Sequence, residues 1–168
     1  MRRASVVAML VGSLWAAAAA ATPADTVAAS GAAAAERQVA APRVRTVTFG
    51  IRHRVFADFA QLSEVRMKEQ FQVGDSPYTA RAVEFVPDFS LDLDTRRVVS
   101  RSNEPKNPAF RVIVTEKGVP SDTAWAFLNM PPHFSRRSML AFQVLRIEFV
   151  NRPALAARDT TLLLKGRR

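Results

Sequence analysis

The chain has 168 residues, of which 48% are hydrophobic and 23% are charged, and it contains no cysteine. This length fits one ordinary domain with extensions, because compact domains usually have about 100 to 150 residues. The apolar fraction excludes a wholly disordered chain, and the six glycines exclude a collagen-like repeat. The lack of cysteine excludes disulfide scaffolds, thiol catalysis and thiolate metal sites.

The first 21 residues have the three parts of a secretory signal peptide. Arg2 and Arg3 form a basic start, an apolar run follows over residues 4–21, and small residues precede a cut after Ala21. We therefore predict an exported protein, periplasmic or secreted. The alternative is an uncleaved N-terminal membrane anchor, because the apolar run is close to the ~18 residues that a spanning helix needs.

Residues 22–43 are rich in alanine, carry proline near both ends and contain no Leu, Ile, Met or aromatic side chain. Such a segment has nothing large to bury, so it predicts a disordered linker.

From residue 44 to residue 150 the hydrophobic pattern takes the two-residue period of β-strands. A turn is predicted at 52–54, and a hairpin is predicted from residues 110–115 and 123–129, joined by a loop at 117–122. In the last strand Ala141, Leu145, Ile147 and Phe149 are expected to share one face. Further strands are predicted at 44–51, 55–59, 65–73, 78–86, 91–99 and 141–150.

Short strands at intervals of about 8 to 12 residues, with glycine and proline between them, are typical of all-β folds. We predict a small antiparallel β-sandwich or a partly open β-barrel of about seven to nine strands. This β-domain covers 44–150, and 151–168 form a basic C-terminal tail.

The net charge of +9 lies mainly at the two ends of the chain. Residues 46–150 carry 14 basic and 12 acidic side chains, whereas residues 151–168 carry five basic and one acidic. A nearly balanced domain does not favour nucleic-acid binding, which normally needs a basic face. The tail is either simply solvated or makes peripheral contact with an anionic membrane or envelope polymer.

Two loops and one strand supply the candidates for binding a ligand or partner. Trp125 and Phe127 share a strand face, and His133 follows two prolines that fix the backbone around it. Asn103 and Asn107 lie in a polar loop of the kind that often carries function. The structural alternative is that His133 is an ordinary surface residue and that the loop is a connector.

An acidic run provides the remaining candidate chemistry. In an extended chain Asp88, Asp92 and Asp94 share one face, where carboxylates could hold Ca²⁺ or serve a hydrolase. The simpler interpretation is an exposed strand face, or pairing with the nearby arginines Arg96, Arg97 and Arg101. No nucleophile motif is present in the sequence, so we predict no catalytic residue, no cofactor and no enzyme activity.

A series of short motifs resembles a known family. They are Val73-Gly74-Asp75, Glu84-Phe85-Val86-Pro87-Asp88-Phe89, Ser100 with Ser102-Asn103, Pro105 with Asn107-Pro108-Ala109, Gly118, and Trp125 with Phe127 before Pro131. The pattern is similar to the extracytoplasmic β-domain of ResB-type cytochrome c biogenesis proteins. The resemblance implies a β-domain outside the cytoplasm and an accessory role in extracytoplasmic cytochrome c maturation. It assigns no functional residue, and this chain lacks the membrane helices between which the family domain is embedded.

The leading prediction is an exported, non-enzymatic β-domain that binds a protein or a cell-envelope component. Binding would use a sheet edge or the loops at 100–109 and 130–138. The accessory role in cytochrome c maturation and the carboxylate- or metal-dependent hydrolase remain the alternatives.

Overall fold

The computed structural model describes residues 40–158 of the chain. The predicted signal peptide (1–21), residues 22–39 of the predicted linker and residues 159–168 of the predicted tail lie outside the described residues. Within residues 40–158 no helix has the length and apolar character that a bilayer crossing would require.

The described residues form ten strands, so the predicted all-β fold is confirmed. The count exceeds the expected range because the predicted strand at 91–99 is part of a two-stranded hairpin, and because residues 155–156 add a further strand. The strands are β1 (Val44–His53), β2 (Ala60–Val65), β3 (Gln70–Gln72), β4 (Tyr78–Val86), β5 (Phe89–Leu91), β6 (Val98–Ser100), β7 (Ala109–Glu116), β8 (Val119–Phe127), β9 (Leu140–Phe149) and β10 (Leu155–Ala156).

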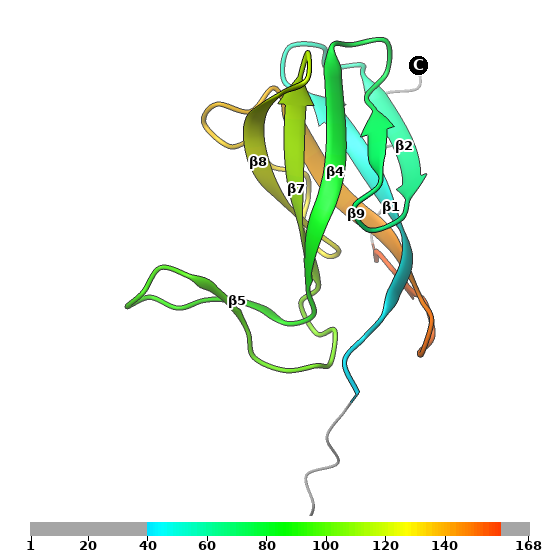
Figure 1. Cartoon of the computed structure of the whole chain (residues 1–168), viewed down its shortest axis with the longest axis vertical. Helices are drawn as coiled ribbons and strands as arrows, with labels where there is room; N and C mark the ends of the chain where they lie inside the picture. Colours follow the sequence, from blue (N-terminus) through cyan, green and yellow to red (C-terminus); the bar gives the residue numbers. More distant parts are fainter. Residues whose placement is uncertain (1–39, 159–168) are drawn as a thin grey trace, which may run out of the picture. The chain divides into compact units, whose positions relative to one another are not determined.

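Two four-stranded antiparallel sheets pack face to face (Figure 1). Sheet A has the strand order β10-β9-β1-β2, and sheet B has the order β3-β4-β7-β8. Strand pairing does not join the two sheets, so the architecture fits a small β-sandwich and is not a closed barrel.

The third sheet, β5-β6, interrupts a connection between neighbouring strands. β4 and β7 pair antiparallel, and their pairing closes at Val86 opposite Ala109. Residues 87–108, which we call the arm, lie between these two paired residues and contain both β5 and β6. The arm therefore begins and ends at the same end of the two central strands of sheet B.

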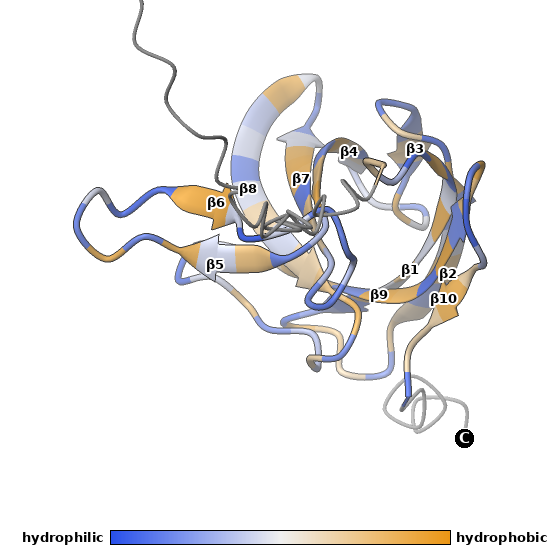
Figure 2. Cartoon of the chain, turned by 90° about the horizontal axis from the view of Figure 1, so that it is seen from below, coloured by the Kyte–Doolittle hydropathy of each residue, from blue (hydrophilic) through white to orange (hydrophobic). Residues whose placement is uncertain are grey.

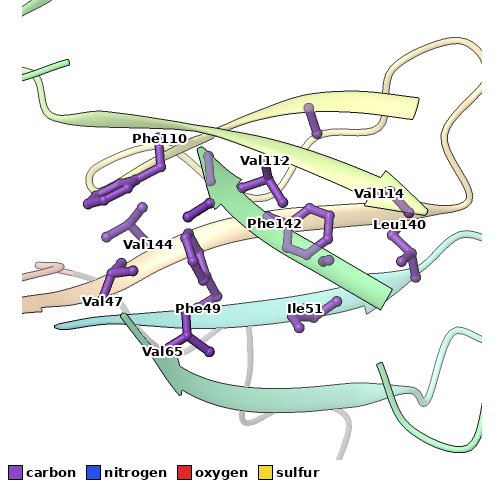
Figure 3. Packing of buried hydrophobic residues seen from close by; sticks show 14 of the residues in the cluster. Val47, Phe49, Ile51, Val65, Phe110, Val112, Val114, Leu140, Phe142 and Val144 are labelled. Atoms are coloured by element: carbon purple, nitrogen blue, oxygen red, sulfur yellow. The ribbon is translucent and has the colours of Figure 1, made fainter. Parts of the chain in front are cut away.

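Large apolar side chains of sheet A and smaller ones of sheet B fill the space between the sheets (Figure 3). Phe49 of β1 lies at the centre, with its ring 5.7 Å from that of Phe110 and 6.2 Å from those of Phe71 and Phe142. Alanines line much of the inner face of sheet B, which lets these rings fit. Burying each such aromatic side chain stabilises the fold by about 1.5–3 kcal/mol. The inward alanines are Ala80, Ala82, Ala124 and Ala126.

The predicted face of the last strand is right for Ile147 and Phe149 but wrong for Ala141 and Leu145, because β9 contains a β-bulge. The pairing with β1 shifts after Arg146, so that Val144 is the next paired residue and Leu145 is the extra one. Phe142 and Val144 consequently point into the core together with Ile147, whereas Ala141 lies outside the core cluster. A bulge reverses the alternation that a regular strand would keep.

The predicted strand at 65–73 is interrupted by a turn at 66–69, which separates the end of β2 from β3. β2 ends at Val65 and β3 begins at Gln70, and Lys68 between them has a φ of 65°. The Lys68 N–H donates to the Ala82 carbonyl at 2.7 Å, and the Arg66 N–H donates to the Glu69 carboxylate at 2.9 Å. The alternation of residue types continues through this turn, which is why the pattern concealed it.

The predicted turn at 52–54 and the predicted strand at 55–59 are also wrong. β1 continues through His53, and six residues, 54–59, separate it from β2, which begins at Ala60. The His53 Nδ1 accepts hydrogen bonds from the backbone N–H groups of Val55 and Phe56, at 3.1 and 3.3 Å. This side chain therefore satisfies the loop backbone in place of a neighbouring strand.

The predicted hairpin of β7 and β8 is confirmed, but its turn is shorter than expected. Glu116 pairs with Val119, so two residues, Lys117 and Gly118, connect the strands. Their φ values of 49° and 84° are the two positive angles that a type I′ turn requires.

Candidate interaction surface

Within the arm, β5 and β6 form a hairpin whose tip is residues 92–97. Phe89 pairs with Ser100 and Leu91 pairs with Val98, and the Asp92 N–H donates to the Arg97 carbonyl at 2.9 Å to close the tip. The arm stands to one side of the two four-stranded sheets (Figure 2). An isolated two-stranded hairpin has marginal stability in water, so other contacts must hold it in place.

The Asp92 side chain organises the tip. Its Oδ1 accepts hydrogen bonds from the N–H groups of Asp94, at 2.9 Å, and Thr95, at 3.0 Å. The hydrogen bond from the Thr95 backbone, together with the one from Asp94, lowers the pKa of Asp92 below its usual value. Asp92 therefore acts as a structural cap in the charged state.

Asn107 binds the strand β5 through its backbone carbonyl and its side-chain amide. The Phe89 N–H donates to the Asn107 carbonyl at 2.9 Å, and the Asn107 Nδ2 donates to the Phe89 carbonyl at 3.0 Å. The two residues thus hold each other as neighbouring strands would. This predicted site residue fixes the position of the Phe89 side chain.

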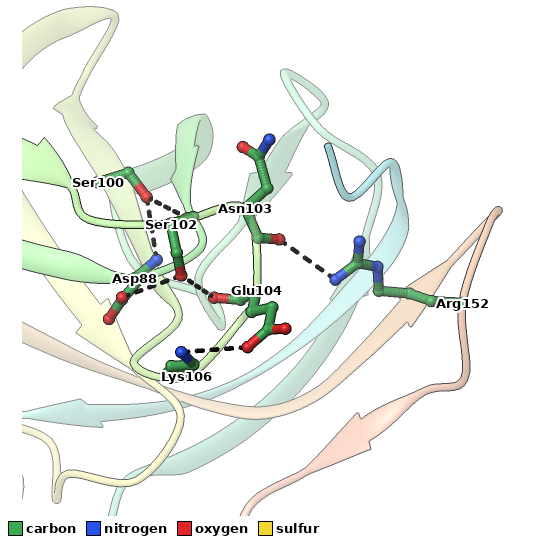
Figure 4. A network of polar contacts seen from close by, with 7 residues as sticks. All are labelled: Asp88, Ser100, Ser102, Asn103, Glu104, Lys106 and Arg152. Carbon is green, nitrogen blue, oxygen red and sulfur yellow. Dashed lines mark hydrogen bonds and ion pairs between the residues drawn. The ribbon is translucent and has the colours of Figure 1, made fainter. Parts of the chain in front are cut away.

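A polar network closes the base of the arm (Figure 4). The Asp88 N–H donates to the Ser100 hydroxyl at 3.2 Å, and the Ser102 hydroxyl donates to the Asp88 carboxylate at 3.1 Å. The predicted site residue Asn103 contributes its backbone carbonyl, which accepts a hydrogen bond from Arg152 at 3.3 Å. Segments 88, 100–104 and 152 are therefore linked at this one end of the sandwich.

An aromatic cluster packs the arm against sheet B. The Phe89 ring lies 5.1 Å from that of Trp125 and 4.9 Å from that of Phe127, both in edge-on geometry, and Phe127 lies 5.7 Å from His133. Three residues predicted as candidates, Trp125, Phe127 and His133, are thus brought together. Each aromatic pair contributes about 0.5–1.5 kcal/mol beyond its buried area.

The cluster lies on the outer face of sheet B and not in the core. Ala124 and Ala126 alternate with Trp125 and point inward, and Trp125 pairs with the exposed Arg111 on the strand next to it. The sequence pattern placed Trp125 and Phe127 correctly on one face. It missed Phe89, whose position after Pro87 at a strand end was the one available signal.

The three predicted acidic ligands have separate roles. Asp88 binds Ser102 at the base, Asp92 caps the tip, and Asp94 lies beside it with its N–H bound to Asp92. In residues 40–158 no three His, Asp or Glu side chains lie close enough together to hold a metal ion.

The arm exposes apolar and basic side chains together. Leu93 at the tip is 82% exposed, and Leu91 and Val99 are 48% and 41% exposed. The arginines expected to neutralise the acidic run form no ion pair with described residues. The three ion pairs in residues 40–158 join Lys106 to Glu104, Arg111 to Glu84 and Arg146 to Glu148. These unpaired arginines are Arg96, Arg97 and Arg101.

A separate hollow of about 190 Å³ lies at the opposite end of β4 from the arm. Tyr78 and Val114 form part of its wall, together with the charged side chains of Glu116, Asp122 and Arg137. The Ser135 hydroxyl donates to Asp122 at 3.3 Å, so one carboxylate is already engaged. The hollow offers mixed charges, whereas the arm combines exposed apolar surface with a defined backbone edge.

The arm and the aromatic cluster are the arrangement in residues 40–158 that best fits a binding surface. Exposed apolar side chains on a held hairpin are typical of surfaces that another molecule covers. No family model, curated protein or solved structure matches this chain, so the ResB-type resemblance stays a prediction.

Proposed function

We propose that this chain is an exported, non-enzymatic binding domain that docks a protein of the cell envelope through the arm. One observation carries the proposal: a hairpin anchored at its base presents Leu91 and Leu93 to solvent near its tip, and Val99 on the face opposite Leu91. Burying such side chains against a partner would stabilise a complex by about 25 cal/mol for each Å² removed from water.

The anchoring supports binding as much as the exposed surface does. Asn107 and Phe89 fix the hairpin against the sandwich, so the arm is ordered before any partner arrives. A surface that is already ordered loses less conformational entropy on binding, which favours affinity. The polar residues at the base serve this positioning role, and the apolar residues at the tip make the contact.

Retrieval of a partner from envelope extract, followed by titration with the purified partner, tests the proposal. We expect Leu93→Asp to abolish retrieval, because the substitution places a charge in the proposed contact. Leu62→Asp is the matched control, since Leu62 lies on β2 away from the arm and is 59% exposed. The proposal fails if the two variants retrieve the same proteins in the same amounts.

Export is tested separately by fractionating cells that produce the full chain. We expect the chain in the exported fraction, with residues 1–21 removed, and we expect it to stay inside when those residues are deleted. A full-length chain that sediments with the membrane would support the anchor instead.

A further inference from the structure

The hydrogen-bond pattern of the arm leaves one edge open. The Asp92 N–H binds the Arg97 carbonyl, and the Arg101 N–H binds the Asp88 carbonyl. Bonded pairs alternate along an antiparallel ladder, so Ser90 and Val99, midway between them, form the next bonded pair. The N–H and C=O groups of Val98 and Ser100 therefore point away from β5.

The other edge of the hairpin is already occupied at its base. On β5 the backbone groups that point outward at Phe89 are both bound by Asn107. On β6, by contrast, β5 is the one neighbouring strand among residues 40–158. β6 thus presents the longer open row of backbone donors and acceptors.

Basic side chains flank this open edge. Arg97 immediately precedes β6 and Arg101 immediately follows it, and both are exposed. Of the nearby carboxylates, Asp88 binds Ser102 and Asp92 binds the backbone of the tip, whereas Asp94 adds one exposed carboxylate at the tip. A strand added at this edge would meet positive charge at both of its ends.

We propose that β6 binds an extended acidic segment of the partner by strand addition. The backbone of the segment would bond to Val98 and Ser100, and its carboxylates would approach Arg97 and Arg101. A third strand would also stabilise a hairpin that two strands alone support weakly. This inference rests on the proposed function and adds the chemistry of the partner.

A second copy of this chain is a poorer occupant of the same edge. If two β6 strands paired antiparallel about Val99, Arg97 of one copy would lie opposite Arg101 of the other at both ends. Like charges directly opposite each other in a sheet are destabilising. The charges therefore favour a different, acidic chain.

Fluorescence anisotropy of the full chain with labelled peptides tests the inference. The probe is the alternating peptide Asp-Val-Asp-Val-Asp-Val-Asp, and its control is the same peptide with lysine in place of aspartate. We expect the acidic peptide to bind at least about tenfold more tightly, with an affinity that falls as salt is added. Equal binding of the two peptides, or no binding of the acidic one, would overturn the inference.

Two variants locate the binding. Val98→Pro removes an outward N–H while keeping the ladder bond of Val99, and proline is tolerated at such edge positions; we expect it to abolish peptide binding. Arg97→Glu with Arg101→Glu should reverse the peptide preference, whereas the control pair Arg45→Glu with Arg81→Glu should leave it unchanged. Unaltered binding in Val98→Pro would refute strand addition.

The outcomes separate this inference from the proposed function. If partner retrieval depends on Leu93 but survives Val98→Pro and the double reversal, the arm is the docking surface and strand addition is wrong. If sedimentation shows a dimer that Val98→Pro dissociates, the occupant is a second copy and the acidic-partner inference is wrong. Unfolding midpoints of all variants, measured in parallel, confirm that each one folds.

Discussion

The core and the arm use the same kinds of side chain in opposite ways. In the core Phe49 is fully buried, and its ring contacts aromatic rings from both sheets. In the arm the Phe89 ring packs against sheet B, while the Leu93 side chain remains 82% exposed. The contrast indicates a division of roles: the core holds the fold, and the arm holds exposed side chains in a fixed place.

The largest expected effect tests the core side of this contrast. Phe49→Ala should lower the free energy of unfolding by about 3–5 kcal/mol, because it leaves a cavity where three rings meet. Denaturant unfolding measures this loss. Leu62→Ala, at an exposed position, should change it by less than about 0.5 kcal/mol. Equal losses in the two variants would contradict the location of the core.

Phe89→Ala should release the arm while leaving the sandwich folded. We expect a local loss of about 1–3 kcal/mol, because two aromatic contacts disappear and the ring is half-buried. Hydrogen exchange should become faster in β5 and β6 and stay unchanged in β7 and β9. If exchange rises equally in all four strands, the arm is part of one cooperative unit with the core.

Asn107→Ala should weaken the anchoring of the arm less than Phe89→Ala does. The variant loses the Nδ2 donor but keeps the backbone bond to Phe89, so about 0.5–1.5 kcal/mol of local stability should be lost. The matched control is Asn129→Ala, which alters an exposed asparagine outside the arm. Exchange of the β5 amides distinguishes them, and identical rates would show that Asn107 does not anchor the arm.

Asp92 should give the smallest effect, and one that depends on pH. Because hydrogen bonds lower its pKa in the folded chain, its contribution to the order of the tip is complete above its unfolded pKa. That contribution is lost as the pH falls through the lowered folded value. We expect exchange at the Thr95 amide to lose this pH dependence in Asp92→Asn. A dependence that persists in the variant would assign it to another group.

The sequence predicted the strand content and the β7–β8 hairpin because alternation and turn residues are local signals. It failed where one side chain replaced a backbone partner, as His53 does for Val55 and Phe56, and where a bulge reversed the faces at Leu145. The His53 contact is local but is made by a side chain, and the bulge depends on how β9 pairs with the distant strand β1. Hydrophobic periodicity encodes neither feature.

Part of the candidate site could likewise be predicted. Trp125 and Phe127 share a face because they are two residues apart on a strand, and this spacing is visible in the sequence. The contact of Phe89 with Trp125 and Phe127 is long-range and is set by the hairpin and by Asn107, so its position after Pro87 hints at a strand end but not at this contact. The sequence also did not reveal that the arginines of the arm are unpaired, since an acidic run beside a basic one suggests that the two form ion pairs.

The connection between β4 and β7 makes the arm an exchangeable module. Val86 and Ala109 face each other in the ladder, so the two ends of residues 87–108 lie at the distance that a two-residue turn spans. A short turn could therefore replace the whole arm, or a different hairpin could be grafted between the same two residues. Evolution and protein engineering alike can then vary the hairpin that this sandwich carries without rebuilding its sheets.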